Sequence, residues 1–265
     1  MKEARPFRSL IDMQTKALAV DIIGLVPLLL VIVQMLSPRR YLIPVRYLIL
    51  SKLIADGLEI IVVMMLLVAS QLIFGDWIQT KYRPIVGYLA LSLQYSSFYT
   101  SLALTLNRFM VVMNPLRYNF LFNEKTTVIM VVICWLFAWI HNLIYLKPEC
   151  SFTYDPTILQ FVFSNDRCGA ALSLYQDLVY NVVLALLSTA VDIFSLTRLR
   201  SMSSRTRRSP GESKREKPWF LQATINSFLY VLMLASFHIS DYVNDVTVQF
   251  LLTVIVWQMW LSAAP

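Results

Sequence analysis

Asn107-Arg108-Phe109, followed six residues later by Pro115-Leu116-Arg117-Tyr118, ends the third long apolar run of the chain and opens a basic loop. An arginine at the end of an apolar helix has two interpretations. In one it is an anchor whose charged head extends to the polar boundary of a membrane. In the other it takes part in a functional contact at that boundary. The rest of the chain bears on the choice.

The composition is that of a membrane protein. Of the 265 residues, 57% are hydrophobic and 15% are charged, and the mean hydropathy is +0.61. In soluble domains, about a quarter of all residues are charged. The net charge of +7 lies in the segments between apolar runs. We therefore interpret the positive charge as a signal of membrane orientation and expect no nucleic acid as a partner.

Seven apolar runs reach the roughly 20 residues that a spanning helix needs, the last one barely. Backbone polar groups in lipid must be satisfied within the chain, so each run should be a helix. The sequence thus predicts an all-α membrane protein, a single seven-transmembrane helix bundle over residues 1–265 with a short or truncated seventh helix. The predicted spans are 17–36, 47–74, 84–107, 126–146, 171–197, 218–240 and 246–264.

The basic residues predict which side each loop faces. Loops one, three and five carry fourteen lysines and arginines, against eight on the other side, four of which lie in the N-terminal segment. Positive charge remains on the cytoplasmic side during insertion. We therefore expect these three loops in the cytosol, the N-terminus outside the cell, and a multi-pass protein of the plasma membrane.

The cysteines agree with this orientation. Cys150 and Cys168 both fall in loop four, which would face an oxidising compartment. They either form a bridge that closes a short loop or remain two free thiols. Cys134 lies within the fourth run and is interpreted as a small buried apolar residue.

Residues along most of the chain, from Gly24 to Trp257, resemble the nematode serpentine chemoreceptors of class X (the Srx type). These receptors have Asn-Arg-Phe, as in Leu106-Asn107-Arg108-Phe109, where rhodopsin-like receptors have Asp-Arg-Tyr. The other matching residues are Pro115-Leu116-Arg117-Tyr118, Phe122, Cys150-Ser151-Phe152-Thr153-Tyr154, Cys168, Tyr175-Gln176-Asp177, Asn181, Asp192, Ser236-Phe237-His238, Val248-Gln249-Phe250 and Trp257.

This resemblance implies a rhodopsin-like receptor architecture and a chemosensory, G-protein-coupled function. Binding of an extracellular small molecule or peptide would be transmitted to a heterotrimeric G protein in the cytosol, across the lipid bilayer. Arg108 would contact the fifth and sixth segments at rest and the G protein when active. The residues that the resemblance assigns to G-protein coupling are Arg108, Asn107, Phe109, Pro115, Leu116 and Tyr118.

The chain also departs from the receptor pattern. Asn107 replaces the acid that restrains the arginine in rhodopsin-like receptors, so we expect Arg108 to be less tightly held and basal activity to be higher. The third run has no cysteine at its outer end, which excludes the usual bridge to loop four. Segments six and seven lack Cys-Trp-x-Pro and Asn-Pro-x-x-Tyr, and the sequence ends at Pro265. A truncated, non-signalling receptor paralogue therefore stays an alternative.

Polar residues inside the predicted spans are further candidates, because charges in a membrane are costly and usually face the protein interior. Lys52, Asp56 and Glu59 share one helical face. Asp56 is either the ion- and water-binding acid that the resemblance implies or the partner of Lys52. Asp192, near the inner end of the fifth run, meets a cytoplasmic network or the arginines of loop five, or else is solvated at the interface. A multi-spanning transporter or channel would also explain these acids.

The third run carries a stripe of hydroxyl groups at spacings of four, three and four residues. The stripe either lines a small-molecule cavity or packs against neighbouring helices. A second stripe, Ser97, Ser101 and Thr105, is interpreted as a helix-packing face. The ligand-binding candidates are Tyr88, Ser92, Tyr95, Tyr99, Asp177, Asn181 and His238.

The sequence carries no motif of an enzyme. His-Glu-x-x-His, Gly-x-Ser-x-Gly, phosphate-binding glycine loops and Cys-x-x-Cys are all missing from it. The two histidines lie in different predicted helices. We therefore expect neither catalysis nor a metal site nor a cofactor.

Overall fold

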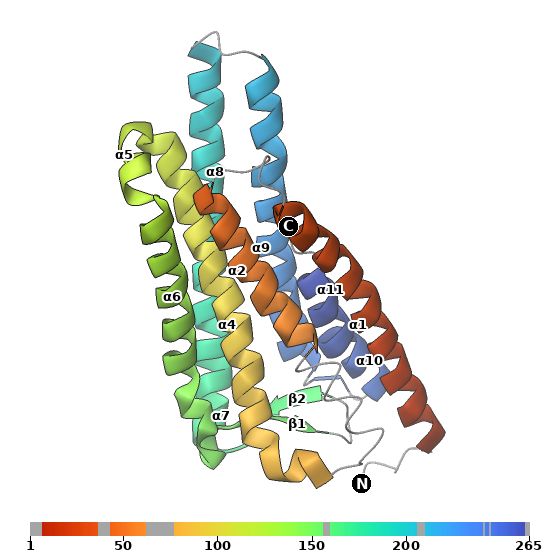
Figure 1. Ribbon diagram of the computed structural model, residues 1–265. Helices are drawn as coiled ribbons and strands as arrows, with labels where there is room; N and C mark the ends of the chain where they lie inside the picture. The colour runs from red at the N-terminus through yellow and green to blue at the C-terminus, as the bar shows by residue number, and fades with distance from the viewer. Residues whose placement is uncertain are drawn as a thin grey trace.

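The computed structural model describes residues 7–36, 43–61, 77–155, 160–205, 210–240, 242–243 and 245–262, and shows a bundle of long helices (Figure 1). The second predicted run continues through residues 62–74, which lie outside the described part, as do Arg39 and Arg40 of the first predicted loop. The long helices are α1 (Phe7–Leu36), α2 (Ile43–Leu58), α4 (Trp77–Met113), α6 (Glu124–His141), α8 (Asn181–Arg205) and α9 (Pro210–Ser240).

Short elements complete the two ends of the bundle. A small helix, α5, lies at the end of the bundle opposite to a two-stranded sheet (Figure 1). The short elements are α5 (Pro115–Leu121), η2 (Asn142–Leu146), η3 (Pro148–Cys150), β1 (Phe152–Asp155), β2 (Gln160–Phe163), α7 (Arg167–Ala171), the π-helix η4 (Leu172–Tyr180), α10 (Val246–Phe250), the π-helix η5 (Leu251–Ile255) and α11 (Val256–Ser262).

Each predicted run overlaps a helix, but only part of the described chain has the length and apolar composition of a membrane span. Two stretches, Glu124–Leu146 and Arg167–Ser201, are long and apolar enough to cross a membrane by those two properties. Shorter apolar helices lie at Leu18–Val33, Ile225–Ser240 and Thr247–Leu261. The arrangement of seven membrane spans therefore stays a prediction.

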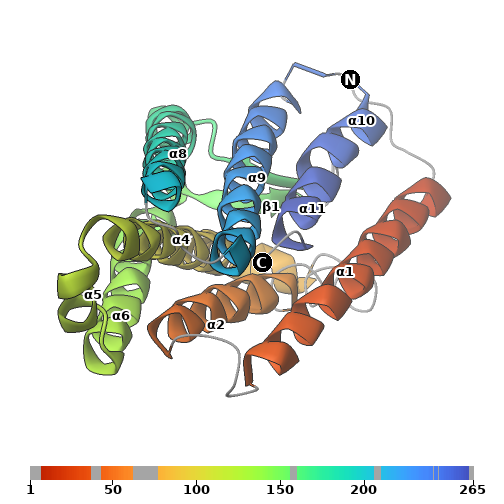
Figure 2. The ribbon, with the colours of Figure 1, turned by 90° about the horizontal axis from the view of Figure 1, so that it is seen from above.

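Helix α4 lies at the centre of the bundle and carries several buried polar side chains. It contacts α2, α6, α8, β1 and η2, and Figure 2 shows it among α2, α6 and α8. Every side chain from residue 90 to residue 100 is buried. Hydroxyl groups on such a helix need partners within the protein. Thr100 donates to the Ser96 carbonyl at 2.7 Å, and its Oγ1 lies 3.4 Å from Ser51 Oγ on α2.

Local sequence explains the turn between α4 and α6. Pro115 stands at the first position of α5, where a missing N–H costs nothing. Asn123 then caps α6: its Oδ1 accepts from the Thr126 N–H at 2.9 Å, and the Thr126 hydroxyl accepts from the Asn123 N–H at 3.1 Å. Such a reciprocal pair satisfies two backbone donors that a helix start would leave free.

Strands β1 and β2 form an antiparallel hairpin between α6 and α8. The register pairs Phe152 with Phe163 and Asp155 with Gln160. A disulfide joins Cys150 to Cys168, so it closes the two ends of the hairpin segment on each other. The hairpin rests on α4 at Gly87, where a Cβ atom would lie 1.6 Å from the Phe152 carbonyl oxygen.

We expect Gly87→Ala to lower the free energy of unfolding by about 1–3 kcal/mol, because the hairpin backbone or α4 must move to make room. Gly57→Ala is the matched control, since its Cβ would meet only the flexible Leu28 Cδ2, at 3.1 Å. Thermal unfolding of the purified protein in detergent measures both. Equal losses in the two variants would contradict the close contact at Gly87.

Candidate functional site

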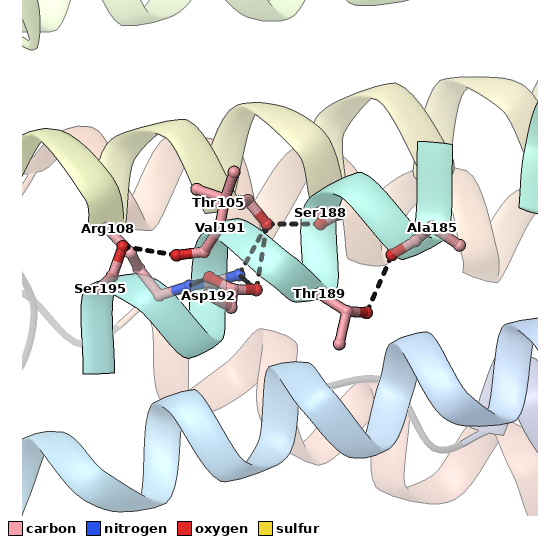
Figure 3. Close-up of polar contacts among 8 residues, drawn as sticks. All are labelled: Thr105, Arg108, Ala185, Ser188, Thr189, Val191, Asp192 and Ser195. Carbon is pink, nitrogen blue, oxygen red and sulfur yellow. Dashed lines mark hydrogen bonds and ion pairs between the residues drawn. The ribbon is translucent and has the colours of Figure 1, made fainter. Parts of the chain in front are cut away.

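Arg108 and Asp192 form a two-pronged ion pair between α4 and α8 (Figure 3). Arg108 Nε donates to Asp192 Oδ1 at 2.9 Å, and Nη2 donates to Oδ2 at 2.8 Å. Asp192 is 1% exposed and Arg108 is 19% exposed. The planar guanidinium fits a carboxylate in this geometry, and such charge-assisted bonds are among the strongest in proteins.

Two hydroxyl groups complete the site around this ion pair. Thr105, one turn before Arg108, accepts from Arg108 Nη2 at 2.9 Å and donates to Asp192 Oδ2 at 3.2 Å. Its Oγ1 also lies 2.8 Å from Ser188 Oγ, one turn before Asp192 on α8. Because one turn separates the residues of each pair, the four side chains meet on the facing sides of the two helices. The Arg108 site is defined by Thr105, Arg108, Ser188 and Asp192.

The expectation that Arg108 is less tightly held is wrong in this structure. It followed from Asn107, which replaces an acid next to the arginine. The acid comes instead from Asp192, 84 residues further along the chain. Thr105, which was expected to belong to a packing face, is a second partner of the guanidinium. The sequence signal for this contact was the pair Ser188 and Asp192 at helical spacing.

Asn107 has another role, which is to connect α4 with α5. Its side chain is 2% exposed, and its Nδ2 donates to the Tyr118 hydroxyl at 3.2 Å. The Tyr118 ring stacks on Phe122 with ring centres 5.5 Å apart. Burial raises the pKa of the Tyr118 phenol, and the hydrogen bond from Asn107 partly offsets this effect. Asn107 thereby holds α5 against the end of α4.

Helix α5 presents two large apolar side chains to its surroundings. Leu116 is 97% exposed and Phe120 is 79% exposed, and four residues separate them on one face. Pro115 begins the helix and is also exposed. Phe109 points elsewhere, with its ring 6.4 Å from that of Phe194 on α8. Phe120 was not among the residues that sequence motifs indicated, although its spacing from Leu116 could have suggested it.

The acids of α2 lie in the interior of the bundle. Lys52 and Asp56 form an ion pair at 2.5 Å, and their side chains are 2% and 0% exposed. The Lys52 ammonium also lies 5.7 Å from the centre of the Trp260 ring. Glu59 is 0% exposed, and neither of its carboxyl oxygens has a hydrogen-bond partner among the described residues. The structure thus pairs Asp56 with Lys52 and leaves Glu59 outside that pair.

Four of the ligand-binding candidates form a connected set that meets α4 at Tyr95, in the middle of the helix. The Tyr95 hydroxyl donates to the Gln176 carbonyl at 3.1 Å and accepts from Asn181 Nδ2 at 3.0 Å. Asp177, one turn from Asn181 on η4, lies 3.3 Å from His238 Nε2 on α9. The outer polar network is defined by Tyr95, Asp177, Asn181 and His238, and it links α4, η4, α8 and α9.

The remaining candidates of the stripe point elsewhere. Tyr88 donates to the Trp139 carbonyl of α6 at 3.2 Å. The Tyr99 hydroxyl lies 3.1 Å from His141 Nδ1 and 3.2 Å from the Tyr180 hydroxyl. Ser92 is 0% exposed, and its hydroxyl has no partner among the described residues. The stripe therefore contacts both α6 and η4.

Comparison with known proteins gives one clear match. The family described as "Serpentine type 7TM GPCR chemoreceptor Srx" matches residues 18–263, which is nearly the whole chain. Among curated proteins, none matches this sequence. The matched segment contains the Arg108 site, the acids of α2, the hairpin and the outer polar network.

A double-mutant cycle tests the ion pair of the Arg108 site. We expect Asp192→Leu alone to lower the free energy of unfolding by about 1–3 kcal/mol, because it leaves a partly buried guanidinium without an acid. Adding Arg108→Met should recover part of that loss. Thermal unfolding in detergent measures the cycle, and strictly additive effects of the two changes would show that the residues do not interact.

The buried phenol predicts a dependence on alkaline pH. Because the pKa of Tyr118 is raised in the folded protein, its contribution to stability is complete below about pH 10 and is lost as pH rises further. Tyr118→Phe should flatten that alkaline loss and cost about 1 kcal/mol near neutral pH, because Asn107 loses its acceptor. Unfolding measured across alkaline pH checks this.

Tyr242→Phe is the control for Tyr118→Phe, since the Tyr242 ring is 88% exposed. An unchanged alkaline slope in Tyr118→Phe would refute the assignment.

Proposed function

The chain belongs to the Srx family of serpentine seven-transmembrane chemoreceptors, and on this premise we propose that it transmits binding of an extracellular small molecule or peptide to a heterotrimeric G protein. Receptors of this kind are multi-pass proteins of the plasma membrane. The observation that carries the proposal is the ion pair between Arg108 and Asp192, because it joins two long helices at the position of the family's arginine.

The ion pair restrains the resting arrangement. Breaking a buried ion pair leaves a charge without compensation, so the two helices separate at a cost. Thr105 and Ser188 extend the contact by one turn and add hydrogen bonds that the same separation would remove. A ligand activates such a receptor by binding more tightly to the arrangement in which the pair is open.

The proposed orientation places the N-terminus outside the cell and α5 in the cytosol. The disulfide and the hairpin lie at the opposite end of the bundle from α5 (Figure 1). Disulfides persist in oxidising surroundings, which favours the hairpin as the extracellular end. The predicted loop between the fifth and sixth spans carries eight of the fourteen basic residues assigned to the cytosol, and the ends of α8 and α9 that flank it lie at the same end of the bundle as α5 (Figure 1). Both features support the proposed orientation.

The outer polar network is the proposed ligand-binding region. Tyr95, Asp177, Asn181 and His238 come from four elements, so a ligand that contacts them senses the relative positions of those elements. Asn181 Oδ1 is buried without a partner among the described residues. Tyr88, Ser92 and Tyr99 are further candidates along α4. A polar ligand group would satisfy acceptors and donors that the resting protein leaves open.

The G protein would bind at the other end. There, Leu116 and Phe120 offer an exposed apolar pair on α5, and Asn107 and Tyr118 set the position of that helix relative to Arg108. Apolar anchors of this kind carry much of the binding energy in protein interfaces. Pro115 and Phe109 complete the proposed coupling region. Opening of the Arg108 site would free the guanidinium for the same partner.

Asp192→Asn should raise basal second-messenger output roughly three- to tenfold at equal surface expression, because it removes the charge that holds Arg108. Arg108→Ala should abolish the output, and the double variant should resemble Arg108→Ala. The measurement is second-messenger output in cells that express epitope-tagged receptor. Ser195→Ala is the matched control, because Ser195 lies one turn beyond Asp192 and donates only to the Val191 carbonyl, at 2.7 Å (Figure 3). Basal output equal to wild type in Asp192→Asn would contradict the proposal that the ion pair with Asp192 restrains Arg108.

A further inference from the structure

Several side chains of the β1–β2 hairpin are buried as deeply as the core of the bundle. Phe152 is 2% exposed, Phe161 is 4% exposed and Gln160 is 5% exposed. Loops between helices ordinarily run over the protein surface. Here the two phenylalanine rings stack with centres 5.1 Å apart and belong to the same cluster of buried residues as α2, α4 and α11. The hairpin therefore fills the space between helices at its end of the bundle.

One face of the hairpin lies against α4 and α9. The Phe152 carbonyl meets α4 at Gly87. The rings of Phe152 and Phe163 lie 6.2 Å and 6.1 Å from the ring of Phe237 on α9. Phe237 precedes His238 of the outer polar network, so the hairpin adjoins the proposed ligand-binding region.

Strand β2 also reaches the seventh helical segment, which comprises α10, η5 and α11. The Phe161 ring makes an edge-to-face contact with Trp257, with ring centres 5.7 Å apart. Gln160 Oε1 lies 3.5 Å from the hydroxyl of Thr253, one turn before Trp257. An aromatic ring and an amide oxygen from the hairpin thus meet a ring and a hydroxyl on one face of the seventh segment.

Trp257 lies on the same short helix as Trp260, which contacts residues at the centre of the bundle. Trp260, one turn further along α11, lies 5.0 Å from the ring of Tyr230 on α9. Tyr230 stacks on Phe98 of α4 with ring centres 4.7 Å apart. Because Trp257 and Trp260 belong to one short helix, a shift of Trp257 moves Trp260 relative to α9 and α4. The contact between the hairpin and Trp257 is therefore linked to the packing of α11, α9 and α4.

The disulfide does not fix the position of the hairpin relative to the helices, so these noncovalent contacts determine it. It links Cys150 to Cys168, both within the connection between α6 and α8, and does not join the hairpin to α4 or to the seventh segment. The bridge keeps the hairpin segment together as a unit. Its seat in the bundle depends on noncovalent contacts at Gly87, Phe237, Thr253 and Trp257.

We propose that the hairpin is an internal ligand of this receptor, with Phe161 and Gln160 occupying a site on the seventh helical segment formed by Trp257 and Thr253. The seated hairpin stabilises the resting arrangement, and an activating ligand displaces it. Such a ligand presents an aromatic ring for Trp257 beside a small polar group, as the hairpin does with Phe161 and Gln160. The inference rests on the proposed receptor function and deepens it.

Basal second-messenger output tests the internal ligand without any external one. Phe161→Ala should raise basal output roughly two- to tenfold at equal surface expression, because it removes the ring contact with Trp257 together with those to Phe152 and Tyr154 within the hairpin. Phe163→Ala is the comparison variant: it removes the same atoms from the same strand, and the ring contacts of Phe163 among the described residues are with Tyr145, Phe152 and Phe237 rather than with Trp257. Because the contact with Phe237 also holds the hairpin, its basal output should rise, but by less than that of Phe161→Ala.

The partner residue completes the experiment. Trp257→Leu should also raise basal output, and the rise in the double variant should be smaller than the sum of the two single rises, because both changes remove the ring contact between Phe161 and Trp257. If Phe161→Ala fails to reach the cell surface, Phe161→Leu keeps most of the buried volume without the ring and takes its place. Additive effects of Phe161 and Trp257, or an equal rise in Phe163→Ala, would overturn the assignment of this contact.

Failure of the inference is separable from failure of the proposed function. If Asp192→Asn raises basal output while both Phe161 variants stay at the wild-type level, the internal ligand is refuted and the restraint at Arg108 stands. If the Phe161 variants raise output while Asp192→Asn does not, the hairpin holds the resting state and the restraint at Arg108 is refuted. If none of these variants raises output, both proposals fall.

Discussion

The burial of the central stretch of α4, residues 90–100, is the constraint on which the rest of the structure depends. Polar side chains on such a stretch lose water as a partner, so hydrogen bonds to neighbouring elements stabilise them. Thr100 bonds to its own helix and approaches Ser51, and Ser51 in turn accepts from the Trp135 indole at 2.9 Å. Tyr95 and Thr105 reach η4, α8 and the Arg108 site in the same way. The polar residues of α4 therefore hold the surrounding helices in place.

The two ends of α4 are held by different physical means. At one end the contact is electrostatic, a two-pronged ion pair that a change of charge would open. At the other end the contact is steric, a backbone carbonyl seated against a residue without a Cβ atom. Charge contacts are directional and switch between discrete arrangements, whereas close packing at Gly87 transmits any movement of the hairpin to the helix. Such a division suits a receptor that senses at one end and couples at the other.

Residue patterns predicted the helices and the family, and they left the Arg108 site incomplete. Runs of apolar residues carry information about local structure, and the runs that were expected all overlap helices in the described chain. The partner of Arg108 was left open between two interpretations of Asp192, and the absence of an acid at Asn107 led to the wrong expectation of a loosely held arginine. Phe161 and Trp257 carried no sequence signal of their contact, because Phe161 lies in the predicted fourth loop and Trp257 in the seventh run.

The sequence by itself determined which segments are helical, where positive charge gathers and which receptor family the motifs belong to, because these properties depend on neighbours a few residues apart. Only the tertiary structure decided that Asp192 rather than a neighbour holds Arg108, that Asn107 binds Tyr118, and that the hairpin reaches the seventh helical segment. Each of these contacts joins different elements of the fold, and the contact between Arg108 and Asp192 spans 84 residues. The rotation and depth of whole helices set such contacts, and packing of the entire bundle fixes both.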